Sequence, residues 1–437
     1  MRDTLERTLG FRDLTLITVG LVIGSGIFIV PATVLRQVGG DVGTALLVWL
    51  VAGVLSLLGA LTYGELATMR PQAGGLYVFM RDAFGPFIAF LFGWTMFFVI
   101  ATGAVATLAA AFTGYLGEFV RLGPIMRKVA AVSIVVVVSA INIIGTRTSA
   151  GVQVWTTATK VLVLVGMSLL LLMHGSGLSM WGASLVPRGL SFAVLPGVGL
   201  AMVGVLWAYE GWQYVTFSAG EAVDPQRTFP RALTIGTIVL IGLYCLANIA
   251  YVAALGPERA QQSESIAAAA MSSLFGATAG RIVAAGILLS IFSAANGVVL
   301  TASRVTFAMA RDGVFFRRLG EVHPRFGTPA LAIGAAAVWS AILAATGTFE
   351  QLLTYVVFTG WIFYALGAAA VFVFRRTEPE AVRPFRVPGY PFTPLLFVLA
   401  SAAIVLNTLV TQPVQAVLGL AVVFAGAPAY LLWRTRR

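Results

Sequence analysis

The sequence has 437 residues, of which 59% are hydrophobic and only 10% are charged. This composition excludes an ordinary soluble domain, in which about a quarter of the residues are charged. The formal net charge of +11 resembles that of a nucleic-acid-binding protein, but the basic residues are spread between apolar segments. We therefore expect a membrane protein with no nucleic-acid partner.

Runs of roughly 18 or more apolar residues, long enough to cross about 30 Å of hydrocarbon, recur along the whole chain. They are longer and more continuous than the alternating strands of a membrane barrel, so we predict an all-α polytopic fold. The sequence predicts about twelve spans in the lipid bilayer, near residues 14–36, 43–66, 84–117, 128–145, 151–173, 194–220, 231–254, 276–308, 328–347, 350–374, 391–411 and 413–433.

The basic residues follow the predicted topology. With the N-terminus inside, twenty of them fall in inner loops and tails and seven in outer loops, where Arg121, Arg127 and Lys128 form the main exception. This bias satisfies the positive-inside rule and predicts a cell (inner) membrane protein with both termini in the cytoplasm. The longest polar connections, near 309–327 and 375–390, are too short for a soluble domain.

Span 1 contains residues that a helix facing lipid avoids. Gly24, Ser25 and Gly26 lie at mid-depth, followed by Ile27, and glycine weakens a helix by roughly 1 kcal/mol relative to alanine. A break in the helix is one interpretation. Close helix packing is the other, because Gly20 and Gly24 are four residues apart.

Span 6 has a similar interruption, and this favours a break in both spans. Trp207, Ala208, Tyr209, Glu210 and Gly211 place a carboxylate, a glycine and aromatic rings in mid-span. Each interrupted span opens a group of five spans, and an odd number of spans reverses the orientation of the second group. The pattern predicts an inverted repeat.

The predicted division of the single transmembrane domain, residues 1–437, follows from this repeat. Residues 14–173 form the first five-helix repeat, residues 194–374 the second, and residues 391–433 two extra C-terminal helices. Two broken helices that face each other leave backbone N–H and C=O groups at a shared cavity. An α-amino acid fits such a cavity, because its carboxylate accepts from N–H groups and its ammonium donates to carbonyls.

Two charged residues lie inside predicted spans. Lys160 in span 5 is one of only two lysines in the chain, and a lysine at this depth costs about 2.5 to 3.5 kcal/mol on insertion scales. It either takes the place of a metal cation or carries a proton, or else it snorkels to the interface. Glu210 either lines the substrate path or accepts hydrogen bonds from the broken helix. Glu221 is predicted to be interfacial.

Motifs for catalysis, metals and cofactors are weak. The two histidines, His174 and His323, fall in predicted loops, and Gly24 and Gly26 do not follow a strand as a dinucleotide fingerprint requires. We expect no enzyme activity, no metal site and no cofactor. The single cysteine, Cys245, lies in an apolar run and cannot form an internal disulfide.

An ordered set of motifs resembles the amino acid, polyamine and organocation superfamily, and within it the L-type amino acid transporter-like permeases. The resemblance covers nearly the whole chain. It is carried by Gly24-Ser-Gly-Ile-Phe28, Pro71-Gln-Ala-Gly-Gly-Leu-Tyr77, Phe84-Gly-Pro86, Tyr209-Glu-Gly-Trp212, Asp224-Pro-Gln-Arg-Thr-Phe-Pro-Arg231, Ser303-Arg-Val-Thr-Phe-Ala-Met-Ala-Arg-Asp-Gly313, Phe326-Gly-Thr-Pro329 and Arg383-Pro-Phe-Arg-Val-Pro388.

The resemblance implies a LeuT-like fold, with substrate held between spans 1 and 6. It places the substrate carboxylate at the backbone N–H groups of Ser25, Gly26 and Ile27. The substrate ammonium is implied to meet the carbonyls of Val22, Trp207 and Glu210. Trp207 corresponds to an aromatic gate residue, and Lys160 to a span 5 lysine associated with sodium-independent transport.

One departure from the animal L-type transporters concerns their partner glycoprotein. The loop near 118–128 has no cysteine, so we expect no disulfide-linked partner. The predicted function is sodium-independent transport of L-amino acids by alternating access, either as an exchanger or as a proton-coupled symporter. A membrane sensor that binds an amino acid without moving it is the alternative. The preferred side chain stays open.

Overall fold

The chain folds into a bundle of helices, as composition and span length predict. The structure, a computed structural model, describes residues 7–175, 187 and 195–434. Within these residues, β-structure is limited to one isolated bridge between Leu9 and Ala222. The predicted all-α fold class is confirmed.

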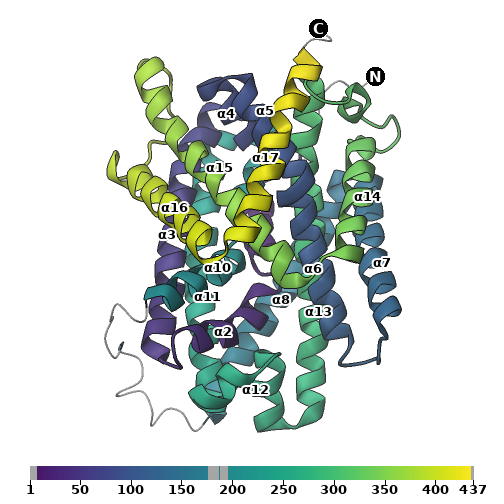
Figure 1. Cartoon of the computed structure of the whole chain (residues 1–437), viewed down its shortest axis with the longest axis vertical. Helices are drawn as coiled ribbons and strands as arrows, with labels where there is room; N and C mark the ends of the chain where they lie inside the picture. Colours follow the sequence, from purple (N-terminus) through teal and green to yellow (C-terminus); the bar gives the residue numbers. More distant parts are fainter. Residues whose placement is uncertain (1–6, 176–186, 188–194, 435–437) are drawn as a thin grey trace.

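The elements follow one another with short connections, and most run along the long axis of the molecule (Figure 1). They are α1 (Phe11–Val22), α2 (Gly26–Gln37), α3 (Val42–Met69), α4 (Leu76–Phe84), α5 (Pro86–Thr95), the π-helix η1 (Met96–Ile100), α6 (Ala101–Leu116), α7 (Pro124–Ile144), α8 (Thr146–His174), α10 (Leu195–Ala208), the 3-10 helix η3 (Trp212–Glu221), α11 (Pro225–Gln262), α12 (Ile266–Phe275), α13 (Ala277–Arg311), the 3-10 helix η4 (Arg317–Gly320), α14 (Ala330–Thr346), α15 (Phe349–Thr377), α16 (Phe392–Thr411) and α17 (Pro413–Arg434).

Length and composition identify most of the predicted spans. Nine of the described helices are long and apolar enough to cross a membrane, and the bent pair α1 and α2 makes a tenth. The remaining two predicted spans contain shorter helices. Residues 328–347 hold α14, which has 17 residues, and residues 194–220 are divided between α10 and η3. This is the pattern of a multi-pass membrane protein.

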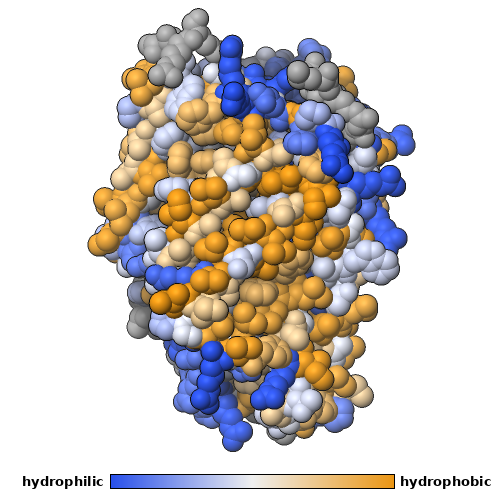
Figure 2. Space-filling view, turned by 90° about the vertical axis from the view of Figure 1, so that its right-hand side faces the viewer, coloured by the Kyte–Doolittle hydropathy of each residue, from blue (hydrophilic) through white to orange (hydrophobic). Residues whose placement is uncertain are grey.

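The outer surface of the bundle suits lipid. Figure 2 shows apolar residues gathered across the middle of one face and hydrophilic residues mainly near its two ends. Large apolar side chains such as Val136 on α7, Leu162 on α8 and Leu406 on α16 are exposed. A continuous apolar surface of this kind is unfavourable in water, but it is favourable in contact with the hydrocarbon of a bilayer.

The interrupted segments lie at the centre of the bundle. α1 and α2 meet at an angle of 42°, α2 packs against α10, and α1 packs against η3, α8, α11 and α13. α16 packs against α15 and α3, and α17 packs against α5 and α15. α16 also packs against α10, and its Phe397 ring lies against the Trp212 ring at the start of η3, with centroids 6.0 Å apart, so this C-terminal helix contacts the second interruption.

Three local features were not predicted. The span near 84–117 contains the π-helix η1, where the Thr102 hydroxyl donates to the Phe97 carbonyl five residues earlier at 2.7 Å. The short helices α4 and α12 lie outside the predicted spans. Side-chain periodicity does not reveal a π-turn, because one extra residue shifts the apolar pattern by only one position.

Both ends of the chain lie at the same end of the bundle, which we call the terminal end (Figure 1). The backbone N–H groups of Thr8 and Leu9 donate to the Glu221 carbonyl at 2.8 and 2.9 Å, and the Val223 N–H donates to the Leu9 carbonyl at 2.8 Å. The segment before α1 is thus tied to the end of η3.

Candidate functional site

The first break separates α1 from α2 at mid-bundle. α1 ends at Val22 and α2 begins at Gly26. Within the described residues, the backbone N–H groups of Ser25, Gly26 and Ile27 donate no hydrogen bond outside the helix ladder. The first N–H groups of a helix carry its positive dipole end, so they form a ready site for an anion such as a carboxylate.

Side chains from three other helices donate to carbonyls of the first break, and two of them reach Gly20, Ile23 and Gly24. Lys160 Nζ on α8 donates to the carbonyls of Gly20 at 2.6 Å and Ile23 at 2.5 Å. Ser290 Oγ on α13 donates to the carbonyls of Ile23 at 3.1 Å and Gly24 at 3.2 Å. These donors satisfy backbone groups that would otherwise be costly in a low-dielectric interior.

Lys160 lies at the middle of α8 and is 2% exposed. Its ammonium points at the broken α1, so the snorkelling interpretation is wrong. The structure gives the physical reason: the break supplies two carbonyl acceptors at membrane depth, so the ammonium binds there without reaching the interface.

The second break lies between α10, which ends at Ala208, and η3, which begins at Trp212. Gly211 has a φ of +130°, which side chains with a Cβ rarely adopt. The chain continues as a 3-10 helix rather than an α-helix. The Trp207 carbonyl accepts from the Glu210 N–H at 3.0 Å, and the Val22 carbonyl accepts from the Gly24 N–H at 2.8 Å, so two carbonyls assigned to the substrate ammonium already have partners.

The two breaks cross each other in close contact. A Cβ at Gly26 would lie 2.5 Å from the Ala208 Cα, and one at Gly211 would lie 2.9 Å from the Leu21 carbonyl carbon. Tyr244 on α11 joins both breaks, because its hydroxyl is 2.9 Å from the Val22 carbonyl and 2.9 Å from the Ala208 carbonyl. Glycine is needed at both crossing points for steric reasons.

Glu210 is fixed by side chains rather than by the backbone N–H groups of the broken helix. Its Oε1 accepts from Gln213 Nε2 at 2.7 Å and from the Tyr364 hydroxyl on α15. The Tyr63 hydroxyl on α3 donates in turn to the Tyr364 carbonyl at 2.7 Å. The second break is therefore linked to α15 and, through it, to α3.

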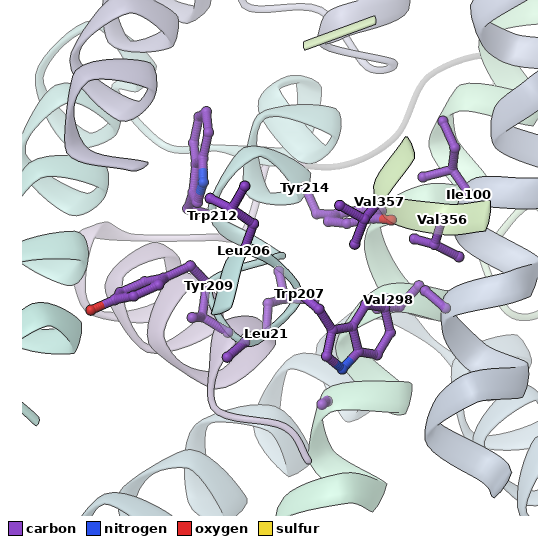
Figure 3. Packing of buried hydrophobic residues seen from close by; sticks show 14 of the residues in the cluster. Leu21, Ile100, Leu206, Trp207, Tyr209, Trp212, Tyr214, Val298, Val356 and Val357 are labelled. Carbon is purple, nitrogen blue, oxygen red and sulfur yellow. The ribbon is translucent and has the colours of Figure 1, made fainter. Parts of the chain in front are cut away.

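The aromatic residues of the second break point in two directions. Figure 3 shows Trp207 directed toward Val298, and Tyr214 directed toward Val357, whereas Tyr209 points the opposite way. The Tyr209 ring packs near Tyr244, with ring centroids 4.9 Å apart. Trp207 and Tyr214 therefore face a common space, and the Tyr209 side chain is part of the surrounding core.

A small cavity of about 20 Å³ lies where the breaks cross. Its lining residues are Leu21, Val22, Gly24, Ser25, Gly26, Ala104, Leu108, Trp207, Glu210, Gly211, Tyr214 and Val298. This volume holds about one water molecule, so the breaks are closed on each other in this conformation. Ile27, Ala208 and Tyr209 lie beside the lining, and their assignment to substrate binding stays a prediction.

Side-chain partners of the breaks were missed from the sequence. Gln213, Tyr244, Ser290 and Tyr364 hold the two breaks, although each lies in an apolar run. Their polar groups were the available signal. That signal is weak, because a hydroxyl inside a helix often bonds to its own backbone, as many in this chain do.

Glu221 lies inside the bundle, and its predicted position at the depth of the membrane interface stays a prediction. Its carboxylate is buried and pairs with the fully buried guanidinium of Arg304 on α13, at 2.8 Å. Arg304 also donates to the Thr146 hydroxyl at the start of α8 at 2.8 Å. A buried carboxylate requires such a partner, and no local pattern indicates that Arg304, about 80 residues further along the chain, supplies it.

The motifs outside the breaks meet at the terminal end. Asp312 accepts from the Tyr77 hydroxyl and from Arg81, both at 2.8 Å. Arg375 and Arg383 pair with the buried Glu65 at 2.7 and 3.5 Å. Burial opposes the charge of Arg81, but its two carboxylate partners outweigh burial and raise the pKa of Arg81. These pairs join α3, α4, α13 and α15.

Metal ligands are not clustered in the part of the chain that the structure describes. No group of three or more His, Cys, Asp or Glu side chains there could hold a metal ion. Cys245 lies within α11 as a free cysteine. The charged side chains at the two breaks are the Lys160 ammonium and the Glu210 carboxylate.

Comparison with known proteins fits this geometry. Residues 9–427 match the family model for amino acid permeases. The chain belongs to that family. The permease is 31% identical to the serine/threonine exchanger SteT of Bacillus subtilis, over 99% of this chain and 98% of that protein. The predicted resemblance to the superfamily and its L-type members is confirmed.

Mammalian relatives are similar at the same level. The permease is 32% identical to the large neutral amino acids transporter small subunit 2 of Mus musculus, over 98% of this chain and 81% of that protein. It is 32% identical to the human cystine/glutamate transporter, over 95% of this chain and 83% of that protein. These relatives are transporters, not enzymes, and the same is expected of this chain.

Proposed function

We propose that this permease moves L-amino acids across the membrane by alternating access, without sodium. The observation that carries the proposal is the crossing of two broken helices, with the N–H groups of Ser25, Gly26 and Ile27 at one side and Lys160 behind the break. The substrate carboxylate binds at the start of α2. Its ammonium binds at the carbonyls of Val22, Trp207 and Glu210.

Lys160 supports the sodium-free part of the proposal. Its ammonium already donates to two carbonyls of the first break, and such carbonyls are the groups that coordinate a cation in discontinuous helices. A covalently attached positive charge at this position takes the role of a bound metal ion. Exchange and proton symport are both compatible with it.

The lining of the cavity supports a neutral substrate side chain. Ala104, Leu108 and Val298 are apolar, and Glu210 is bound by Gln213 and Tyr364 rather than left free for a cationic substrate. The relatives' names include serine, threonine, large neutral, cystine and glutamate substrates. Those names do not select one side chain for this permease.

Trp207 is proposed as the gate over this site. It is 6% exposed, its indole lies beside Val298 (Figure 3), and it lines the cavity. Because the closed cavity holds about one water molecule, an amino acid enters only when the breaks or the indole move. Such a movement is what alternating access requires.

We further propose the topology that the charge pattern predicts. Residues 14–173 and 194–374 form the two inverted repeats, and residues 391–433 form the additional pair. The terminal end faces the cytoplasm of a cell (inner) membrane, because most basic residues lie there by the positive-inside count. With Cys245 as the single cysteine, in α11, a disulfide-linked partner is not expected.

Reconstitution tests the function. Purified permease is screened by thermal shift against the twenty amino acids, and stabilising ones are then tested as labelled substrates in liposomes loaded with unlabelled amino acid. We expect uptake that is equal in sodium and choline buffers. Sodium-dependent uptake would contradict the mechanism. Binding without uptake, with or without a proton gradient, would favour the sensor.

A further inference from the structure

A second cavity, which we call the apolar pocket, lies between α5, η1, α6, α14, α15 and α17. Its volume is about 530 Å³, within the range of about 300 to 1,000 Å³ that small-molecule sites occupy. Every described residue of its lining is uncharged, and the aromatic rings among them are Trp94, Phe98, Trp339 and Tyr355. The pocket is therefore large enough for a ligand, and its lining suits an apolar one.

The two indoles of the lining hold the walls of the apolar pocket in place. Trp94 Nε1 on α5 donates to the Val422 carbonyl on α17 at 3.0 Å, and Trp339 Nε1 on α14 donates to the Phe98 carbonyl at 2.9 Å. The Phe98 ring lies between the two indoles, with ring centroids 4.4 Å from Trp94 and 5.6 Å from Trp339. Because both indole N–H groups already have acceptors, the lining offers little to water.

The wall that faces α14 is formed by the π-helix η1, which includes Phe98 and Val99. Backbone carbonyls of this segment accept from side chains: the Phe97 carbonyl from the Thr102 hydroxyl at 2.7 Å, and the Phe98 carbonyl from Trp339. Single π-turns are rare inside helices and are frequent at functional sites. η1 had no role in the candidate site between the breaks, and the apolar pocket gives it one.

The apolar pocket opens sideways, between α14 and α17. These helices lie on either side of α6 (Figure 1). α14 packs against α6, and α17 packs against α5 and η1, whereas α14 and α17 do not pack closely against each other in the part of the chain that the structure describes. Leu418, Ala421 and Ala425 on α17 line the pocket and are also exposed on the outside of the bundle.

The opening lies at the depth of the membrane hydrocarbon. Leu418 and Ala425 are each more than one turn from the nearer end of α17, which runs from Pro413 to Arg434. α17 is long and apolar enough to cross a membrane. The medium that adjoins the opening is therefore the acyl chains of the bilayer rather than water.

We propose that the apolar pocket binds one acyl chain of a membrane phospholipid. Side chains that line an unfilled cavity lose van der Waals contacts, and an apolar lining does not retain water. A flexible chain from the adjoining bilayer fills the pocket without breaking any hydrogen bond. This site does not depend on the proposed transport function.

The uncharged lining favours a phospholipid over a free fatty acid. A fatty acid would bring its carboxylate to a pocket that has no cation to pair with it, and burying an unpaired charge is costly. A phospholipid keeps its charged headgroup at the membrane surface while one chain enters from the side. A second copy of the permease fits less well, because helix surfaces pack ridges into shallow grooves and would leave much of the pocket unfilled.

The bound chain packs against two helices that also form the candidate site. On α6, Gly103 lines the apolar pocket and the adjacent Ala104 lines the cavity between the breaks. On α15, Tyr355 lines the apolar pocket and Tyr364 donates to Glu210. The acyl chain therefore supports both helices from the lipid side, and we expect phospholipid to raise the thermal stability of the permease.

The double variant Ala421→Phe/Ala425→Phe tests the site by placing two rings at the mouth of the pocket, where they take the space of the chain and keep the surface apolar. Neither alanine lines the cavity between the breaks. Ala402→Phe is the matched control, because Ala402 is also exposed on a membrane-spanning helix, α16, but does not line the apolar pocket.

The measurement uses full-length permease in liposomes of phosphatidylethanolamine and phosphatidylglycerol that contain a trace of a phospholipid with a diazirine in one acyl chain. After illumination, peptide mass spectrometry locates the labelled residues. We expect adducts in the wild type to concentrate on lining residues such as Leu343 on α14. The double variant lowers the labelling of α14 by about tenfold, and Ala402→Phe changes it by less than about twofold.

A second measurement needs no labelled lipid. In detergent, added phosphatidylglycerol raises the thermal midpoint of the delipidated wild type and of Ala402→Phe, and it raises that of the double variant less. A double variant that does not fold leaves the wild-type adduct map as the test.

Four results would overturn the inference. Adducts spread evenly over the lipid-facing helices would indicate ordinary surrounding lipid only. Wild-type labelling of α14 in the folded double variant would show that the chain lies elsewhere. Stronger labelling of the pocket by a diazirine fatty acid than by the phospholipid would identify a free fatty acid. Cross-links that join two chains through α14 or α17 would identify a second copy. None of these results depends on amino acid uptake, so the proposed function stands or fails separately.

Discussion

The two breaks differ in how they are held. Lys160, Ser290 and Tyr244, from three different helices, donate to carbonyls of the first break. The second break depends on Gly211, on one bond from Tyr244 to the Ala208 carbonyl, and on one carboxylate, Glu210, that contacts α15 through Tyr364. A strongly bonded segment suits a fixed binding platform, and a weakly bonded one suits a segment that moves.

The helices after the two breaks differ as well. α2 is an α-helix of 12 residues after the first break, with Pro31 inside it, whereas η3 is a 3-10 helix with a non-helical residue, Ser218, inside it. A stretch of 3-10 helix within a helical span often marks a hinge. We therefore expect substrates to bind on the first break and the second break to supply most of the movement.

The largest expected effect comes from removing the cation of the first break. Lys160→Ala deprives two carbonyls of a charged donor, which is worth about 3 kcal/mol or roughly 100-fold in rate. The initial rate of labelled amino acid uptake in liposomes measures it. Lys128→Ala is the control, because this other lysine is exposed on α7. A folded Lys160→Ala variant with a normal uptake rate would contradict the proposal that the first break is the fixed binding platform.

A smaller effect is expected where the two breaks touch. Gly26→Leu places a side chain against the Ala208 backbone, since even a Cβ would lie 2.5 Å from its Cα. Overpacking that costs about 2 kcal/mol of binding free energy corresponds to a roughly 30-fold loss of affinity for the amino acid. Thermal stabilisation by substrate measures it. Gly166→Leu is the control, because nothing lies within 4 Å of a Cβ there; unchanged stabilisation in Gly26→Leu argues against this site.

The smallest effect is expected at the second break. Tyr364→Phe removes the hydroxyl that donates to Glu210, a loss of about 1.4 kcal/mol or tenfold in transport rate. Uptake rates are compared with those of Tyr355→Phe, which changes a tyrosine of the same helix that lines a separate apolar pocket. If Tyr364→Phe slows transport more than Lys160→Ala does, the roles of the two breaks are reversed.

The sequence predicted the breaks themselves because their cause is local. Glycines and a carboxylate in an apolar run weaken a helix wherever that run folds. The structure places the first break between Val22 and Gly26 and the second between Ala208 and Trp212, where the sequence has these glycines and the carboxylate. The sequence did not decide between a functional and a snorkelling position for Lys160. Its hydrogen-bond acceptors lie on a helix about 140 residues away in the chain.

Composition, span length and the order of motifs determined that this chain is an all-helical membrane permease, because the bilayer imposes those properties on each segment separately. Only the tertiary structure decided which groups meet. It placed Glu221 with Arg304, Glu210 with Tyr364, and the Gln153 amide nitrogen and the Thr157 hydroxyl beside Gly20. Such pairings depend on the relative rotation and depth of helices, and one helix's sequence does not specify them.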